Sequence, residues 1–124
     1  MQKYRTRAIA IGGIGYRAVI ADTSVKRAIG LMFRERLEKG TCMLFVFGSP
    51  GYHGIWMHNM RFPLDVLWLD RNGIVVDKRE NLEPCESMLE CPQHQPKGPA
   101  SYIIELNAGE IGKKKIRAGA RARI

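Results

Sequence analysis

The chain has 124 residues, which is the size of one domain (1–124) and enough to bury a core without metals or disulfides. Its 45% hydrophobic and 26% charged residues are typical of a soluble globular protein, and no stretch approaches the ~20 apolar residues of a membrane span. The net charge of +8 is high for this size, which raises the odds of contact with nucleic acid and also matches charge-rich thermophile proteins.

The N-terminal segment predicts a hairpin rather than a targeting signal. Residues 4–11 and 16–22 alternate polar and apolar side chains, and GGIG between them is typical of a turn. The AIAI run near the start is too short for the core of a signal peptide. We therefore expect a cytoplasmic protein without a membrane partner.

Helix signals follow this hairpin. Thr23 or Ser24 can cap an N-terminus, and VKRAIGLM carries apolar residues at helical spacing. Gly30 inside this run lowers helix stability, so we expect either close packing against a neighbour or an early end of the helix. Residues 34–39 are a charged continuation that ends at Gly40.

The central part of the chain predicts strands. Residues 43–47, MLFVF, are apolar on both faces and indicate a central buried strand, and residues 48–54 read as a loop. Residues 54–70, GIWMHNMRFPLDVLWLD, predict two extended pieces broken at Pro63, because proline has no N–H to donate.

The clearest hairpin joins LDVLWLD to IVVDK through the turn at 70–73, which has Asn-Gly at its centre. Residues 100–107 predict a further strand, GEIGKKKI a short helix and ARARI an edge strand. The fold class is therefore α+β, a mainly antiparallel, curled or barrel-like β-sheet with one or two short helices.

Several blocks of the chain resemble one family. The blocks are GLMFR (30–34), MLF (43–45), WMHN (56–59), PLD (63–65) and the acidic position and glycine of ELNAG (105–109). They closely resemble the uncharacterised bacterial and archaeal family called domain of unknown function 192 (DUF192), over roughly residues 25–120. Cys42 and His58 stand where that family commonly has Gly and Lys. The resemblance implies a compact β-rich fold and no agreed activity.

Asp65 is the most informative candidate residue. Alternation places it on the same face as Leu67 and Leu69, and a carboxylate among apolar side chains must be paired or at an exposed end. Arg34, Arg61 and Asn59 are the partners that we consider. A structural Asp that fixes the turn at Pro63 and a ligand-orienting or acid/base carboxylate both remain open.

Cysteines offer a second candidate site. Cys85, Cys91 and His94 lie within ten residues, in an acidic segment, and Cys91 and His94 have a spacing that zinc sites use. A Cys85–Cys91 disulfide and free thiols are the alternatives, and copper is a weaker one. We predict no metal site and leave the cofactor undefined.

The favoured hypothesis is a binding module for a small polar or anionic molecule or a peptide. Its predicted pocket contains Arg34, Trp56, Met57, Asn59 and Asp65, with Asp65 orienting Arg34. One alternative is a protein associated with nucleic acid through its basic ends, since six basic residues fall in the last twelve positions. The other is a hydrolase or lyase that uses Asp65 and Glu105 as a carboxylate pair.

Overall fold

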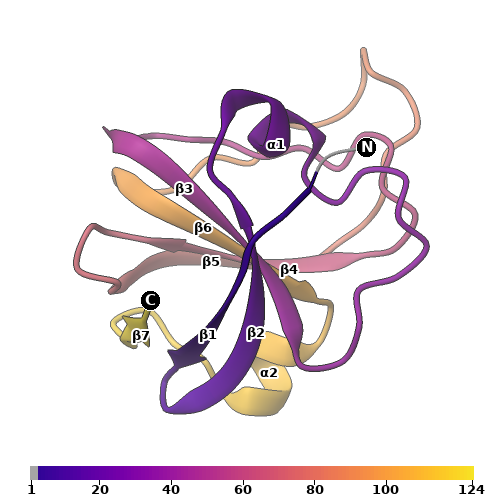
Figure 1. Cartoon of the computed structure of the whole chain (residues 1–124). Helices are drawn as coiled ribbons and strands as arrows, with labels where there is room; N and C mark the ends of the chain where they lie inside the picture. The colour runs from indigo at the N-terminus through magenta and orange to yellow at the C-terminus, as the bar shows by residue number, and fades with distance from the viewer. Residues whose placement is uncertain (1–2) are drawn as a thin grey trace.

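The computed structural model describes residues 3–124, which form one curled seven-stranded β-sheet and two short helices (Figure 1). In chain order the elements are β1 (Thr6–Ile11), β2 (Ile14–Ala21), α1 (Ser24–Ile29), β3 (Thr41–Gly51), β4 (Leu64–Leu69), β5 (Val75–Leu82), β6 (Ala100–Asn107), α2 (Glu110–Lys114) and β7 (Ala122–Arg123). The strand order is β5-β4-β6-β3-β2-β1-β7, and only the β2–β3 pair is parallel. The predicted α+β fold with a mainly antiparallel, curled sheet is confirmed.

The two edges of this sheet approach each other and give it a barrel-like form. β7 pairs with β1 at one edge. Just before β7, Arg121 forms a bridge with Ile74. The N–H of Val75, the first residue of the opposite edge strand β5, donates to the carbonyl of Ala120 at 2.9 Å. These contacts close the gap between the two edges near residues 73–75.

The two faces carry separate apolar clusters because side chains alternate along each strand. One cluster, on what we call the α2 face, contains Ile20, Leu44, Leu67, Ile104 and, from α2, Ile111. The other, on the α1 face, contains Met43, Phe45, Val66, Trp68, Ile103 and, just after α1, Leu31. The helices lie at opposite ends of the molecule (Figure 1).

Helix α1 is shorter than the sequence pattern indicated. Thr23 caps it by accepting a hydrogen bond from the Lys26 N–H, and Gly30 ends it with a φ of 52°. A Cβ at Gly30 would lie 3.3 Å from the Phe45 ring, so this glycine also permits close packing. Both expected explanations for Gly30, an early helix end and close packing, are therefore confirmed. Residues 34–39 do not continue the helix.

The segment before Pro63 is the main departure from the predicted strands. Residues 54–62 are not a strand of the sheet, because they pair only through isolated bridges at Ile55 and His58 and then turn at Asn59, whose φ is 62°. Strand β3 extends to Gly51, beyond residue 47, where the sequence predicted its end. Its pairing with β6 shifts register after Val46.

The β4–β5 hairpin forms as predicted. Asp70 Oδ1 accepts hydrogen bonds from the N–H groups of Asn72 and Ile74, at 2.9 and 3.0 Å, which fixes the turn. Neither helix among residues 3–124 is long and apolar enough to cross a membrane.

Candidate functional site

A cavity of about 290 Å³ lies on the α1 face, between α1, the strands β3 and β6, and the segment 54–60. We call it the Glu105 pocket. Its lining residues are Arg27, Ala28, Ile29, Gly30, Leu31, Met32, Phe45, Phe47, Gly54, Ile55, Trp56, Met60, Gln93, Ile103 and Glu105. Most of these side chains are apolar, which is usual for a small-molecule site with a few polar groups that fix orientation.

Glu105 is the buried polar group of this pocket. Its side chain comes from β6 and is 5% exposed, and its cross-strand neighbours are Met43 and Val66, which supply no hydrogen bond. Oε1 of Glu105 is buried and has no hydrogen-bond partner among residues 3–124. Burial raises the pKa of Glu105 from 4.5 to about 8. The carboxyl is therefore mostly protonated at neutral pH and can donate a hydrogen bond.

Arg27 lies on the α1 wall of the pocket and is held in place. Its Nη1 donates to the carbonyl of Val46 at 2.9 Å, and its guanidinium lies 5.3 Å from the centre of the Phe47 ring. Met43, beside Glu105, and Phe47 are four residues apart on β3, which is roughly 13 Å of strand. The pocket therefore has a carboxylic acid near one end and a fixed cation near the other.

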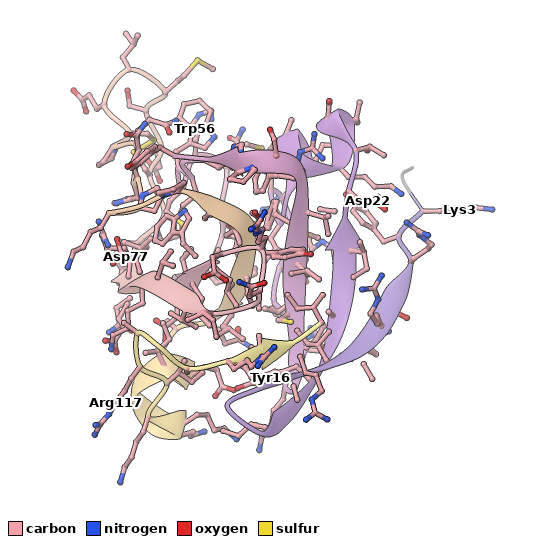
Figure 2. All side chains as sticks on the ribbon, turned by 90° about the vertical axis from the view of Figure 1, so that its left-hand side faces the viewer. Lys3, Tyr16, Asp22, Trp56, Asp77 and Arg117 are labelled. Carbon is pink, nitrogen blue, oxygen red and sulfur yellow. A yellow bond between two sulfur atoms is a disulfide. The ribbon has the colours of Figure 1, made fainter. Side chains whose placement is uncertain are left out.

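Of the five predicted ligand residues, only Trp56 lines this pocket. Trp56 lies beside the loop that carries the disulfide, at the end of the molecule opposite Tyr16 (Figure 2). Met57 is outside the lining and is 1% exposed, in the core of the α1 face. The predicted alternation does not hold here, because the neighbours Ile55 and Trp56 both line the pocket.

Arg34 and Asn59 lie outside the pocket. The Arg34 guanidinium is 5.4 Å from the centre of the Tyr4 ring. Asn59 lines a shallow hollow with Phe33 and Arg61, and its amide is 4.0 Å from the sulfur of Met32. Arg34 and Asn59 are close in the chain to pocket residues, but their own side chains are not part of the lining.

Asp65 has a structural environment. It is completely buried on the α2 face, where Oδ1 accepts from the N–H of Asn81 and Oδ2 from the N–H of Ile111, both at 2.8 Å. The idea that Asp65 orients Arg34 is wrong, because both carboxylate oxygens bind backbone amides instead. These bonds tie β4 to the end of β5 and to α2.

The predicted carboxylate pair is also wrong. In the β4–β6 register Asp65 is opposite Leu106, and Glu105 is opposite Val66. Cross-strand neighbours share a face, so a shift of one residue sends Asp65 and Glu105 to opposite faces of the sheet. A hydrolase or lyase that uses these two carboxyls together is excluded.

The cysteine question is answered by a Cys85–Cys91 disulfide, with the two Cα atoms 5.5 Å apart. The two sulfurs bind each other, so the zinc set with His94 is wrong, and residues 3–124 hold no cluster of three His, Cys, Asp or Glu that suits a metal. Such a bond is uncommon in the cytosol outside hyperthermophiles, and the cytoplasmic location stays a prediction.

The disulfide loop forms part of the pocket wall. Ile55 and His94 exchange two backbone hydrogen bonds, at 2.9 and 2.8 Å, and the N–H of Cys85 donates to the carbonyl of Met57 at 3.1 Å. These bonds hold Gln93 against the segment 54–60, where both contribute to the lining.

Sequence reasoning missed Arg27, Gln93 and the two phenylalanines of the lining. It named Glu105 only as the partner of Asp65. The sequence nevertheless indicated Glu105. It is a single carboxylate in the apolar strand ASYIIELN, and an unpaired buried carboxylate is as costly there as at Asp65.

Comparisons with known proteins agree on family and fold. A model of the family DUF192, described as Uncharacterized ACR, matches residues 8–124. A UPF0127 protein of Pyrococcus furiosus is 33% identical over 106 residues, which cover 82% of this chain and 80% of that protein.

Two solved structures are similar along almost the whole chain. A Sinorhizobium meliloti protein, described as a candidate transcription regulator, has a TM-score of 0.91 at 26% identity and covers 99% of this chain and 96% of its own. A protein of unknown function from Novosphingobium aromaticivorans has a TM-score of 0.87 at 25% identity, with 96% and 85% covered.

Proposed function

The chain belongs to the DUF192 family, and we propose that this member is a binding module for a small molecule held in the Glu105 pocket. One observation carries the proposal: Glu105, which lines a cavity of about 290 Å³, has a buried carboxyl oxygen without a hydrogen-bond partner among residues 3–124. Such a group lowers stability, whereas a ligand that supplies the missing partner would offset that cost.

The size of the cavity limits the ligand. An apolar cavity of about 150 Å³ holds one benzene molecule, so this one suits a molecule of roughly twelve non-hydrogen atoms. Trp56 and the phenylalanines Phe45 and Phe47 provide flat apolar walls, and Gln93 adds a polar group from the disulfide loop. Because these walls are apolar, we narrow the predicted class of small polar or anionic ligands to molecules with an apolar body.

The test is binding by nuclear magnetic resonance. Small molecules of this size are titrated into the ¹⁵N-labelled protein, and we expect saturable shifts at the amides of lining residues. Ala28→Phe places a large side chain on the α1 wall and should weaken binding, whereas Val25→Phe, on the same helix but outside the lining, should not. Shifts that never saturate, or that cluster away from the pocket, would reject the proposal.

A second candidate function, association with nucleic acid, is supported by an arginine cluster. Arg7, Arg71, Arg121 and Arg123 surround a hollow beside β7, together with Tyr102. The similar structure described as a candidate transcription regulator points in the same direction. Arginines around a concave surface suit phosphate groups.

This second function is tested by fluorescence anisotropy with labelled duplex DNA and single-stranded RNA at several salt concentrations. We expect affinity that falls steeply with salt and that weakens in an Arg121→Glu/Arg123→Glu variant. Lys113→Glu/Lys114→Glu, in α2 and outside the hollow, is the control for a change in net charge alone. No binding at low salt would reject the function.

A further inference from the structure

The ligand class of the Glu105 pocket can be specified further, on the basis of the proposed function. We propose that the pocket binds a small apolar carboxylate that carries a neutral hydrogen-bond acceptor at its other end. The acceptor faces Glu105, and the carboxylate faces Arg27. A keto acid with an aromatic body is one example of this class.

The charges around the pocket favour an anion over a cation. Arg27 and Glu105 are the only ionisable side chains in the lining that the structure describes. A cationic ligand would therefore meet one fixed like charge and one mostly neutral acid.

Several charged and polar groups on neighbouring segments are engaged elsewhere. Arg79 of β5 bonds to Asp77 at 2.8 Å and lies over the Trp68 ring. His94 follows Gln93, and burial together with Arg79 lowers its pKa, which keeps it neutral. On β6, Asn107 is two residues from Glu105 and donates to the Leu37 carbonyl at 2.9 Å. None of these groups offers Glu105 a counter-ion.

The protonation state of Glu105 defines what its end of the pocket recognises. Because the carboxyl is mostly protonated below pH 8, its O–H needs an acceptor, and no protein group described in the structure supplies one. A ketone or amide oxygen satisfies this need. A hydrocarbon at the same position leaves the acid unpaired, and sites built for a hydrogen bond reject such analogues strongly.

The length of the pocket sets the spacing between the two polar ends. Phe45 and Ile103 are cross-strand neighbours midway between the Glu105 end and the Arg27 end. Both line the pocket and are apolar, so they suit an aromatic or short aliphatic body and supply no polar contact. A ligand of this class must therefore keep its acceptor and its carboxylate at opposite ends.

The experiment uses three probes of similar shape. 4-Acetylphenylacetate carries both polar ends, 4-isopropylphenylacetate lacks the acceptor, and 4-acetylphenylacetamide lacks the negative charge. Titration calorimetry at pH 6.5 should show that the first binds at least about tenfold more tightly than either of the others. Its affinity should then fall as the pH rises through about 8, because ionised Glu105 cannot donate and repels the carboxylate.

Two substitutions at Glu105 separate its hydrogen bond from its charge. Glu105→Gln keeps a donor and should bind 4-acetylphenylacetate with little dependence on pH between 6 and 9. Glu105→Leu should lose the preference for acetyl over isopropyl. Arg27→Gln should lose the preference for the carboxylate over the amide.

The outcomes distinguish this inference from the proposed function. Equal affinity for the acetyl and isopropyl probes, or tighter binding of 4-acetylbenzylamine than of the carboxylate, would overturn the ligand class and leave a binding pocket. The ligand class also fails if other small molecules shift the lining amides and these probes do not. If no small molecule shifts those amides, the proposed function itself fails.

Discussion

Asp65 and Glu105 lie on neighbouring strands, one position out of register, and point to opposite faces of the sheet. Both are buried, at 0% and 5% exposure. Asp65 accepts two backbone hydrogen bonds, whereas Oε1 of Glu105 has no partner among the described residues. Similar burial therefore goes with different environments. Asp65 joins three elements through its hydrogen bonds, whereas the unpaired oxygen of Glu105 is a group that lowers stability.

Replacing Asp65 should destabilise the protein without affecting the pocket. Asp65→Ala leaves the N–H groups of Asn81 and Ile111 without their acceptor, so we expect a loss of about 3 to 5 kcal/mol in the free energy of unfolding. Urea denaturation measures it. Asp70→Ala is the control, because Asp70 also accepts two backbone hydrogen bonds, but in a partly exposed turn. A smaller loss for Asp65→Ala than for Asp70→Ala would contradict this role.

Glu105 should make stability depend on pH. Its pKa is raised on folding from 4.5 to about 8, so between these values the folded state holds a proton that the unfolded state has released. The free energy of unfolding should therefore fall as pH rises from about 4.5 to 8 and level off above, with a slope of at most ~1.4 kcal/mol per pH unit.

The Glu105→Gln variant isolates this contribution. The difference in unfolding free energy between wild type and Glu105→Gln, measured by urea denaturation from pH 4 to 9, should decrease with pH. At pH 9, Glu105→Leu should be more stable than wild type, because it removes a buried charge that has no partner. A flat difference across this range would show that Glu105 is solvated or paired in solution.

Much of the fold could be predicted from local pattern. The alternation in residues 4–11, the Asn-Gly turn at 72–73 and the apolar run at 43–47 each correspond to one physical rule, and each is confirmed. The parallel β2–β3 pair was not predicted, because strand order depends on contacts between distant segments. The prediction of a strand in the segment 54–62 was wrong. The positive φ of Asn59 and the backbone pairing with the disulfide loop are not visible in hydrophobic periodicity.

The candidate site was predicted less well, for a geometric reason. Alternation tells which residues share a face of one strand. It cannot tell which face of β4 matches which face of β6, and that register alone separates Asp65 from Glu105. Arg27 belongs to the site only because α1 ends at Gly30 and packs beside Phe45.

Gly73 should be intolerant of any side chain. Its φ is 81°, and a Cβ there would lie 2.4 Å from the carbonyl oxygen of Ala122 in β7. We expect Gly73→Ala to lower the free energy of unfolding by about 2 to 4 kcal/mol, because it adds backbone strain to a clash with backbone. Gly13→Ala has a similar φ of 83° and no atom within 4 Å, so it reports the strain alone. Equal losses in the two variants, measured by thermal denaturation, would show that contact with β7 is unimportant.

Breaking the Cys85–Cys91 disulfide should loosen one wall of the Glu105 pocket more than the rest of the sheet. The bond closes a short ring, with a sequence separation of 6, so chain entropy alone predicts a loss of about 2 kcal/mol in a Cys85→Ser/Cys91→Ser variant. The amides of Ile55 and His94 should exchange hydrogen faster, since their mutual hydrogen bonds join the ring to the segment 54–60. Hydrogen exchange measures this, with the amides of the β1–β2 hairpin as the internal reference. Adding a reductant should reproduce the effect in wild type and change nothing in the double variant. Equal acceleration in the hairpin and at Ile55 would mean that the disulfide stabilises the molecule globally and does not hold the pocket wall.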